Sequence, residues 1–382
     1  MLTARFYASI NDISRAHWQS LFQGMSLFCQ YDYLLSLENS HCVGGDTGWI
    51  VNHLIMFDND TPVAGMPIYL KMHSYGEYMF DWNWAAAYQQ QQISYYPKLL
   101  SAIPFTPVTG QRLAIVPNLK VSAADIIKGI KATLNQQLQR FDASNFQCLF
   151  NDKAQSDELD SHGLVQRQDI QFHWFNQHYG SFDDFLGKLT ARKRKSIKKE
   201  RLALQTLGLN YRWLSASEIT SEQWQFFYQC YRQTYLKRSG HPGYLNLEFF
   251  LSVAKTLNQY CRLLIVYDSD KAIASALFFV QENTLYGRYW GAMREVPGLH
   301  FEACYYQGIE YCIANKLSKF DAGVQGEHKL NRGFVPVISY GNYLLADSPF
   351  KNAILDVIRR ENQHFQALLA SKSLDSAYRQ ED

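Results

Sequence analysis

The stretch from Asp321 to Phe334 gathers side chains that could carry chemistry. Within six residues it contains one carboxylate, one imidazole and two cations, which are Glu327, His328, Lys329 and Arg332. A cation from Lys329 or Arg332 could bind a phosphate or stabilise an oxyanion. His328 or Glu327 could act as the base toward an attacking amine. This spacing indicates an active-site loop, and the alternative is a solvated loop whose charges pair with one another.

Glycines accompany these charges. Gly323 lies at the end of a predicted strand, and Gln325 and Gly326 follow it. Glycine lets the backbone approach a ligand closely and open its amides toward it. Gln325 and Gly326 are therefore candidate substrate-binding residues.

A second candidate site precedes this stretch, where segment 286–292 (Tyr-Gly-Arg-Tyr-Trp-Gly-Ala) leads by a loop to a helix predicted near Leu299. Amides at a helix N-terminus can bind pyrophosphate. The candidate cofactor-binding residues are Arg288, Tyr289, Trp290 and Gly291. A buried strand followed by a tight loop is the alternative. The helix opens with His300 and Glu302, which would face the Lys329 loop if they turned into a cleft, although the helix dipole alone favours a carboxylate there.

In the first half of the chain, one loop is dense in polar and aromatic side chains. Such loops usually contact a ligand or a partner. Its candidate substrate-binding residues are His73, Glu77, Asp81 and Trp82. Arg112, after the Pro-rich segment 104–111, could meet a substrate carboxylate or phosphate. The alternative is that these residues plug a domain interface.

Seven cations lie between Arg192 and Arg201, and the acid among them is Glu200, whereas the net charge of the chain is only +2. The run falls on a predicted helix. It could bind a polyanion, such as the phosphates of a tRNA or the head groups of a membrane surface. A solvated helix is the alternative.

Several classes of function lack support. The sequence has no His-x-x-x-His, Gly-x-Ser-x-Gly or Walker A pattern, so metal, serine hydrolase and ATPase sites are not expected. Its 7 cysteines include no C-x-x-C pair, which favours free thiols in a reducing compartment. No signal peptide and no long apolar span are recognised, so we expect a cytoplasmic protein without an integral membrane segment.

Apolar periodicity predicts helices and strands in both halves of the chain. In the first half, helices are expected at 13–22, 31–38 and 123–141, and strands at 49–57, 63–71, 98–104 and 146–150. Ser122 should cap the last helix, and the first two strands should form a hairpin. In the second half, helices are expected at 182–207, 224–235, 247–257 and 299–317, and strands at 209–214, 262–267, 272–281, 285–293 and 320–324.

The order of elements is similar in the two halves, which indicates a duplicated α/β architecture. A chain of 382 residues should form two domains, because single cores seldom grow beyond about 250–300 residues. We expect domains at 1–160 and 161–382, with the candidate active site in the second.

These segments together resemble the FemAB-like family of peptidoglycan biosynthesis or recognition proteins, within the GNAT superfamily of acyltransferases. The segments that carry the resemblance are His73-Ser-Tyr-Gly-Glu, Phe80-Asp-Trp, Tyr95-Tyr-Pro-Lys-Leu, Pro104-Phe-Thr-Pro-Val-Thr-Gly, Arg192-Lys-Arg-Lys, Leu285-Tyr-Gly-Arg-Tyr-Trp-Gly, Leu299-His-Phe-Glu-x-Cys-Tyr-Tyr-Gln and Gln325-Gly-Glu-His-Lys. The resemblance implies an α/β fold of two tandem GNAT-like domains, each with a mixed, mostly antiparallel sheet flanked by helices.

The resemblance also implies a reaction. Fem transferases move an amino acid from aminoacyl-tRNA to a peptidoglycan precursor peptide, and they carry a Phe-Lys-x-x-Phe-type element after a glycine-ended strand. Lys329 followed by Phe334 is similar to that element, so the oxyanion-stabilising role implied for its lysine falls on Lys329. His328 replaces the first Phe, and the spacing to Phe334 is longer. GNAT enzymes that use acyl-CoA carry an Arg/Gln-x-x-Gly-x-Gly/Ala loop, which segment 288–293 matches in part.

Two hypotheses about function follow. In the first, the protein is an N-acyltransferase whose donor substrate is acyl-CoA or aminoacyl-tRNA, with no permanently bound cofactor. Its acceptor would be a small molecule or a peptidoglycan precursor. In the second, it is a catalytically inactive GNAT-fold module that binds peptidoglycan fragments or a nucleic acid.

Overall fold

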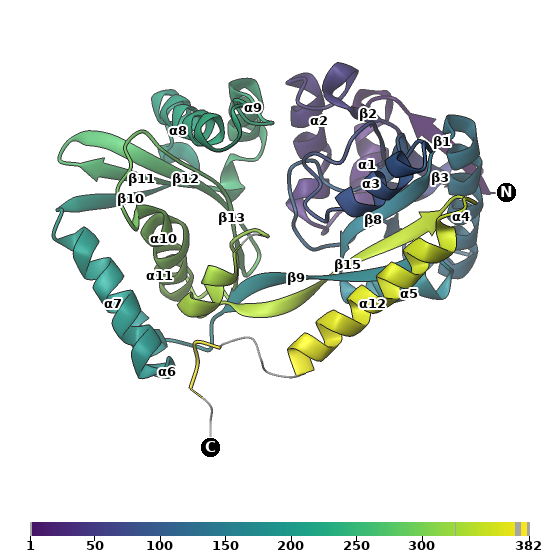
Figure 1. Cartoon of the computed structure of the whole chain (residues 1–382). Coiled ribbons are helices and arrows are strands. Elements are labelled where there is room, and N and C mark those ends of the chain that lie inside the picture. Colours follow the sequence, from purple (N-terminus) through teal and green to yellow (C-terminus); the bar gives the residue numbers. More distant parts are fainter. Residues whose placement is uncertain (1, 325, 371–375, 380–382) are drawn as a thin grey trace. The chain divides into compact units, whose positions relative to one another are not determined.

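The computed structural model describes residues 2–324, 326–370 and 376–379, and only the backbone of Glu327 (Figure 1). By its internal contacts the chain divides into two compact units, Met1–Asp169 with Ile338–Ala367 and Ile170–Val337 with Leu368–Asp382. The sequence indicates one boundary near residue 160, whereas residues 338–367 group with the first unit. The reason is that a strand and a helix near the C-terminus return to the first unit, which apolar periodicity does not encode.

The first unit contains two sheets. One has the order β1-β3-β4-β7 and antiparallel pairs, with the strands at Leu2–Tyr7, His53–Asp58, Thr61–Met66 and Ala114–Ile115. The other runs β15-β8-β6-β5-β2, at Val335–Leu345, Asn145–Asn151, Lys98–Ser101, Tyr69–Lys71 and Trp49–Val51. In that sheet β6 and β8 are parallel and the other pairs are antiparallel. The predicted mixed, mostly antiparallel sheet is therefore confirmed here.

Two strands that the sequence predicts as continuous are each divided between these sheets. The run 49–57 breaks at Asn52 into β2 and β3, and the run 63–71 breaks after Met66 into β4 and β5. The predicted hairpin forms between β3 and β4, while β2 pairs with β5 in the other sheet. Both segments are predominantly apolar, so periodicity alone could not locate the crossing.

Helices of the first unit are α1 to α5 and α12, at Arg15–Phe22, Tyr31–Asn39, Trp82–Gln90, Ala123–Phe141, Lys153–Ser161 and Lys351–Ala370. Helix α4 has the bounds that the sequence predicts. The Ser122 hydroxyl accepts a hydrogen bond from the Asp125 amide at 3.1 Å, as expected of an N-cap. Its apolar face enters a core that includes Ile126, Ile130 and Phe146.

The second unit contains a sheet of order β10-β11-β12-β13-β14-β9. The strands are Leu209–Ser215, Cys261–Asp268, Lys271–Gln281, Thr284–Ala292, Lys319–Asp321 and Val165–Phe175, the last beginning in the first unit. β13 and β14 are parallel and pair only over Thr284–Tyr286 and Lys319–Asp321. β13 continues to Ala292, while β14 ends at Asp321. In the described part of the chain, the ladder between these parallel strands therefore stops at one end of β14.

Helices of this unit are α6 to α9, at Phe182–Lys188, Ala191–Gln205, Ser221–Ser239 and Leu247–Thr256. The prediction of one helix over 182–207 is wrong, because Leu189 is buried and the Thr190 amide donates to the carbonyl of Ala377 at 2.8 Å. The predicted helix 299–317 is interrupted by a π-helical turn, Glu302–Tyr306, between α10 (Leu299–Phe301) and α11 (Gln307–Ala314). Such turns occur frequently at functional sites.

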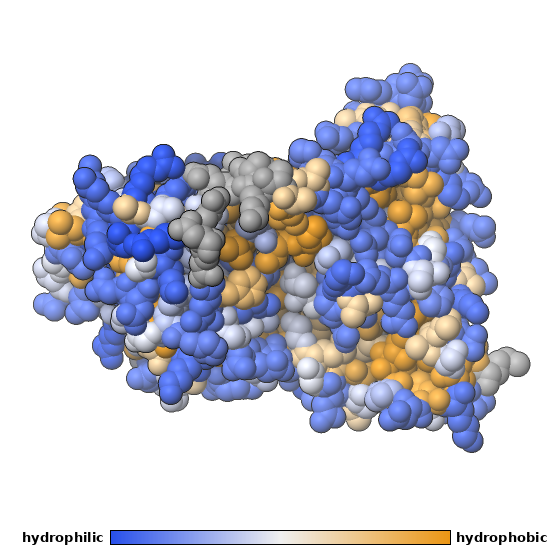
Figure 2. Space-filling model, turned by 90° about the horizontal axis from the view of Figure 1, so that it is seen from below, coloured by the Kyte–Doolittle hydropathy of each residue, from blue (hydrophilic) through white to orange (hydrophobic). Residues whose placement is uncertain are grey.

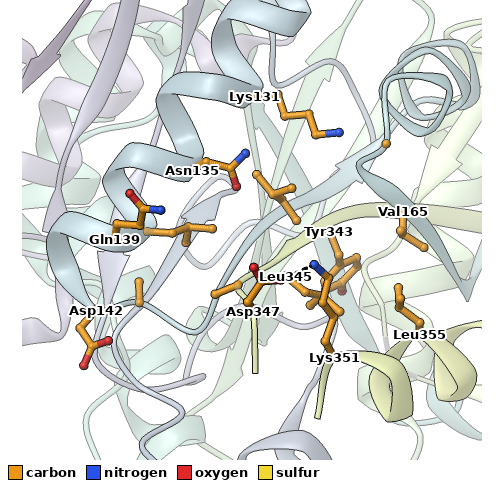
Figure 3. Close-up of a pocket in the computed structure, with 15 residues that line it drawn as sticks. Lys131, Asn135, Gln139, Asp142, Val165, Tyr343, Leu345, Asp347, Lys351 and Leu355 are labelled. Carbon is orange, nitrogen blue, oxygen red and sulfur yellow. Dashed lines mark hydrogen bonds and ion pairs between the residues drawn. The ribbon is translucent and has the colours of Figure 1, made fainter. Parts of the chain in front are cut away.

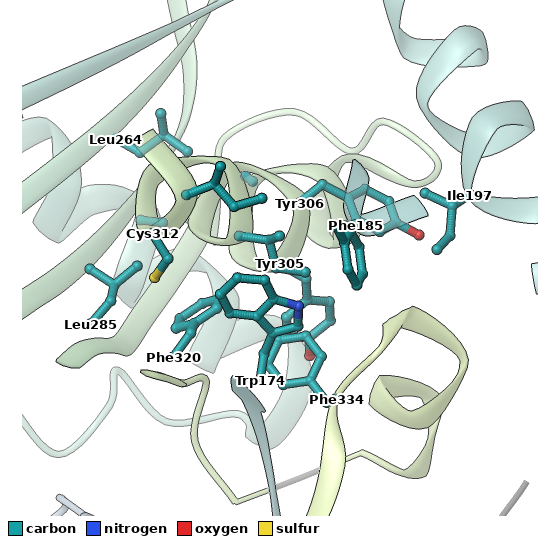
Figure 4. Close-up of a cluster of buried hydrophobic side chains, with 14 of the residues drawn as sticks. Trp174, Phe185, Ile197, Leu264, Leu285, Tyr305, Tyr306, Cys312, Phe320 and Phe334 are labelled. Carbon is teal, nitrogen blue, oxygen red and sulfur yellow. The ribbon is translucent and has the colours of Figure 1, made fainter. Parts of the chain in front are cut away.

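A core of aromatic and aliphatic residues fills the second unit (Figure 4). Trp174 of β9 and Phe185 of α6 pack edge to face with ring centroids 5.8 Å apart. The ring of Phe334 lies 5.5 Å from that of Phe320 in β14 and 5.5 Å from that of Tyr305 in the π-helical turn. Phe334 therefore links β14 to the π-helical turn within this core.

Candidate functional site

Lys329 lies in the short 3-10 helix η7 (Glu327–Arg332), which follows β14. Its side chain is only 1% exposed and points back toward the end of the strand. The Nζ atom donates hydrogen bonds to the carbonyl oxygens of Ala322 at 2.9 Å and Gly323 at 2.5 Å. Burial lowers the pKa of Lys329 to about 8, although Asp321 opposes the shift. The lysine is thus a buried cation fixed against a turn.

The same turn is held from its other side by Asp321. The Gly323 amide donates to Oδ1 of Asp321 at 2.9 Å, and Gly323 has a φ of 83°, which glycine adopts without strain. Oδ2 of Asp321 lies 3.6 Å from Nε2 of His173 in β9. Burial alone would raise the pKa of Asp321, but His173 and Arg288 lower it below its ordinary value. The carboxylate therefore stays charged and orders the turn.

His328 lies among aromatic rings next to Lys329. Its Nε2 is 3.0 Å from the hydroxyl of Tyr305, and its ring centroid is 5.5 Å from that of Phe301. Burial, followed by the charges of Arg332 and Lys329, lowers the pKa of His328. The imidazole is therefore neutral at pH 7 and able to accept a proton.

Arg332 supports this group. Its guanidinium lies 3.6 Å above the ring of Phe301 and donates to both carboxylate oxygens of Glu200 in α7, at 3.0 and 3.1 Å. It also donates to the backbone carbonyl of His328 at 2.9 Å. Arg332 is thus committed to holding η7 against α7 and α10.

His300 and Glu302, the candidate residues at the start of the helix after β13, lie in different surroundings. His300 packs edge to face on Tyr305 at 5.4 Å, and burial, with a smaller contribution from Arg238, lowers its pKa to about 4. Glu302 is buried in an ion pair with Arg201 of α7, at 2.8 and 3.0 Å. The structure therefore places His300 against Tyr305, which also contacts His328. Glu302 instead holds Arg201 of α7 in an ion pair.

The candidate residues at 288–291 lie within strand β13, as the alternative interpretation has it. Arg288 is the extra residue where the register between β12 and β13 shifts. A Cβ on Gly291 would lie 1.8 Å from the carbonyl oxygen of Cys230, so this glycine lets helix α8 approach the strand. The prediction of a cofactor-binding loop that begins at Arg288 is therefore wrong, because residues 288–292 belong to β13. Close packing of α8 on this strand accounts for Gly291. The loop begins after Ala292.

That loop borders a cavity of about 360 Å³. Its lining residues include Arg238 from α8, Trp290 from β13 and His300 from α10. At the helix start, the amides of Leu299, Phe301 and Glu302 already donate to the carbonyls of Val296 and Gly298. These three amides do not form the expected pyrophosphate cradle.

In the first unit, two predicted residues belong to a buried ionic network. Lys98 of β6 donates to Glu77 at 2.6 Å and also to Asp81. Tyr95 donates to Asp81 at 2.5 Å, and Ser74 donates to it at 2.6 Å. Burial would raise the pKa of Asp81, yet Lys98 and these hydrogen bonds lower it to about 2. The network explains the polar residues of this loop as internal partners.

Glu77 also approaches a second buried lysine. Its Oε1 lies 3.9 Å from Nζ of Lys71, which in turn lies 3.7 Å from the ring centroid of Trp49. Burial raises the pKa of Glu77 to about 7, against the opposing charge of Lys98, and lowers that of Lys71 to about 7.

The other predicted residues of this unit lie apart from the network or beside it. His73 contacts the carbonyl of Thr47 at 3.0 Å, and Trp82 is 40% exposed. Arg112 is buried and donates to the carbonyl of Gly110 at 3.1 Å and also to that of Val108. Its guanidinium therefore holds the Pro-rich loop.

A cavity of about 680 Å³ lies between α4 and the region where β15 leads into α12 (Figure 3). Its cations have partners: Lys131 donates to the carbonyl of His162 at 2.9 Å, and Lys351 pairs with Asp347 at 2.7 Å. None of the predicted site residues lines it.

Comparison with known proteins gives a match to the FemAB-like family, described as peptidoglycan biosynthesis/recognition, over residues 9–380. The chain belongs to the FemAB-like family. No curated protein matches the sequence.

Solved structures resemble this FemAB-like protein in fold. The C-terminal domain of a putative lysylphosphatidylglycerol synthetase from Agrobacterium fabrum has a TM-score of 0.51 at 8% identity, covering 93% of this chain and 96% of that one. FemX has a TM-score of 0.50 at 10% identity, covering 90% and 98%. L-PGS from Bacillus licheniformis has a TM-score of 0.50 at 11% identity, covering 86% and 95%. The predicted fold of two GNAT-like domains is confirmed.

The chemistry-bearing set of this FemAB-like protein is larger than the sequence indicates. Glu200 contacts Arg332, and Tyr305 contacts His328. Asp321 binds the Gly323 amide and lies beside His173, so the four added residues come from four different elements. Tyr305 lies within segment 299–307, which carries part of the family resemblance. The π-helical turn that orients Tyr305 carries no sequence signal that we recognise. Of the predicted residues, Gln325 and the side chain of Glu327 lie outside the described part of the structure, and Gly326 has a φ of 114°.

Among the described residues, no group of three or more His, Cys, Asp or Glu is placed to hold a metal ion. No described helix combines the length and apolar character needed to cross a membrane.

Proposed function

We propose that this FemAB-like protein is an N-acyltransferase that moves an acyl or aminoacyl group from an ester or thioester donor to an amine. The observation that carries the proposal is the buried ammonium of Lys329, fixed where the β13–β14 ladder ends and next to the neutral imidazole of His328. A fixed cation in a site shielded from water stabilises developing negative charge far better than one in solvent.

In the proposed mechanism, the acceptor amine attacks the carbonyl carbon of the donor. A C–N bond forms while the π electrons of the carbonyl move to its oxygen. Two N–H groups of Lys329 donate to Ala322 and Gly323, and the third would donate to this oxyanion. His328 would take the proton of the attacking nitrogen and return it to the leaving oxygen or sulfur as the C–O or C–S bond breaks.

Both donor classes, acyl-CoA and aminoacyl-tRNA, remain within the proposal. Three amides at the helix start after β13 are already engaged by backbone carbonyls, which argues against a diphosphate cradle built from them. We therefore place aminoacyl-tRNA before acyl-CoA. For the acceptor we propose an amine of a peptidoglycan precursor, reached from the cytoplasm, because the family is described by peptidoglycan biosynthesis.

The test is a transfer assay with the purified full chain. Each donor class is supplied with a panel of amines that includes a muropeptide, and products are identified by mass spectrometry. Lys329→Ala should reduce transfer by roughly 100-fold or more, as removing one oxyanion donor does. Lys255→Ala, an exposed lysine of α9, is the control and should retain full activity. Full turnover by a folded Lys329→Ala protein, or a wild-type protein that binds a muropeptide and transfers nothing, would contradict the proposal; the second result would support an inactive binding module.

A further inference from the structure

The cationic helix α7 has two chemically different sides. On its inner side, Ile197 and Leu204 are buried, Lys193 is buried and hydrogen-bonded to Asn331, and Arg201 pairs with glutamates. Because Lys193 and Arg201 bind other residues of the second unit, α7 presents less positive charge to solvent than its sequence suggests.

The outer side of α7 carries exposed cations together with exposed leucines. Arg192, Lys195, Lys198 and Lys199 are exposed. Leu202 is 59% exposed, and Leu207, in the turn after the helix, is 52% exposed. Spacings of four and three residues place Lys195, Lys199 and Leu202 on one face of a helix. In Figure 1, α7 lies at the periphery of the second unit.

The charge of this face is incompletely neutralised. Lys198 lies 3.3 Å from Asp183 of α6 in a solvent-exposed pair, which contributes little binding energy. Lys195 and Lys199 have no ion pair with any residue that the structure describes. The surface seen in Figure 2 is mostly hydrophilic, with hydrophobic residues gathered in separate areas. Leucines beside exposed lysines distinguish this face from one that is only charged.

We propose that the outer face of α7, defined by Arg192, Lys195, Lys199, Leu202 and Leu207, docks on an anionic phospholipid surface. A helix that lies in a membrane interface presents lysines to the head groups and aliphatic side chains to the acyl boundary. An RNA partner would favour aromatic or arginine side chains that stack on bases, and it gains little from aliphatic ones. The leucines therefore favour lipid over RNA.

The proposal is independent of the acyl-transfer proposal, because it rests on exposed side chains of α7 and on neither Lys329 nor His328. It concerns where the protein works, and it gives the two exposed leucines a role beside the lysines.

The test is sedimentation of the full chain with vesicles of phosphatidylcholine alone or of phosphatidylcholine mixed equally with phosphatidylglycerol. We expect binding to the anionic vesicles that weakens as salt rises. Each lysine near an anionic surface contributes roughly fivefold in affinity, so Lys195→Gln/Lys199→Gln should weaken binding roughly 25-fold. The matched control Lys255→Gln/Lys271→Gln removes the same charge from other exposed positions of the second unit and should bind as wild type.

The leucines provide the discriminating variant. Leu202→Ser/Leu207→Ser keeps the charge, and it should weaken vesicle binding by roughly fivefold or more while leaving any binding of total tRNA unchanged. The proposal is overturned if anionic vesicles do not bind, if the control pair weakens binding as much as the α7 pair, or if the leucine variant binds vesicles as wild type. Lysine-dependent tRNA binding that is unaffected by the leucine change, in the absence of vesicle binding, would assign this face to RNA.

Discussion

The side-chain ammonium of Lys329 lies 2.5 Å from the carbonyl oxygen of Gly323, to which it donates a hydrogen bond. The residue that the family resemblance places in acyl transfer is therefore also the residue that fixes the turn after β14. A second bond, to Ala322, removes most of its rotational freedom. One N–H remains for a substrate, and its direction is set by the other two.

The first prediction concerns the pH dependence of transfer. The pKa of Lys329 is lowered to about 8 by burial. If the ammonium form of Lys329 is required, kcat should fall as pH rises through about 8; a separate fall at acid pH is expected when the base His328 becomes protonated. Lys329→Arg should retain charge at higher pH and move this fall toward alkaline pH, at lower activity because a planar fork cannot reproduce the lysine geometry. Transfer followed across the range at saturating acceptor tests this, and an unchanged alkaline fall in Lys329→Arg would assign it to another group.

The second prediction concerns His328. After burial, the positive charge of Arg332 is the largest cause that lowers the pKa of His328. Arg332→Gln should therefore raise that pKa, and the neutral imidazole should be lost at a higher pH. Titration of the His328 resonance by NMR, assigned with His328→Gln, measures the shift. Arg294→Gln, which breaks an exposed pair with Asp268, is the control and should leave the titration unchanged.

The third prediction concerns acid stability. The pKa of Asp81 is lowered from 3.8 to about 2. Because the folded pKa is lower than the unfolded one, the contribution is complete above about pH 4 and is lost as pH falls toward 2. Its size is about 2 kcal/mol. Asp81→Asn should lose this acid dependence and be less stable at neutral pH, since Lys98 then lacks a buried partner.

Urea unfolding at several pH values measures this contribution. Asp157→Asn is the control, because it removes an exposed carboxylate of the same unit that pairs with Lys153. An Asp81→Asn protein that loses stability between pH 4 and 2 as steeply as wild type would contradict the assignment to Asp81.

The fourth prediction concerns the packing of α8 on β13. In Gly291→Ala the new Cβ would lie 1.8 Å from the Cys230 carbonyl, so the helix must move. Overpacking of this kind costs about 1–3 kcal/mol. Gly187→Ala is the matched control: it lies in helix α6, nothing is within 4 Å of its Cβ position, and it should stabilise by about 1 kcal/mol. Equal unfolding temperatures for the two variants would contradict this account.

Local signals in the sequence predicted the elements that depend on local structure. Helix α4 has the predicted bounds because its cap at Ser122 and its apolar face are both local. Strands that cross between sheets were not resolved, since the break at Asn52 depends on pairing with a distant strand. The break at Thr190 likewise depends on a contact with Ala377.

The candidate site was predicted only in its local part. His328, Lys329 and Arg332 are close in sequence and lie together in η7. His173 and Tyr305 were hidden, because the pairing of β9 with β14 and a π-helical turn bring them to the site. Glu77 and Asp81 suggested a ligand-binding loop, whereas Lys98 on a separate strand is their partner. Charged residues in a loop do not reveal from sequence whether they face solvent or one another.

The return of β15 to the first unit has a consequence for synthesis of the protein on the ribosome. Residues Tyr340–Leu345 of β15 pair with β8 of the first unit. A nascent chain can therefore contain residues 170–337 of its second unit while the first still lacks a strand. Until the last part of the chain emerges, one edge of β8 is open to other partners, so chains released early should be prone to association through that edge.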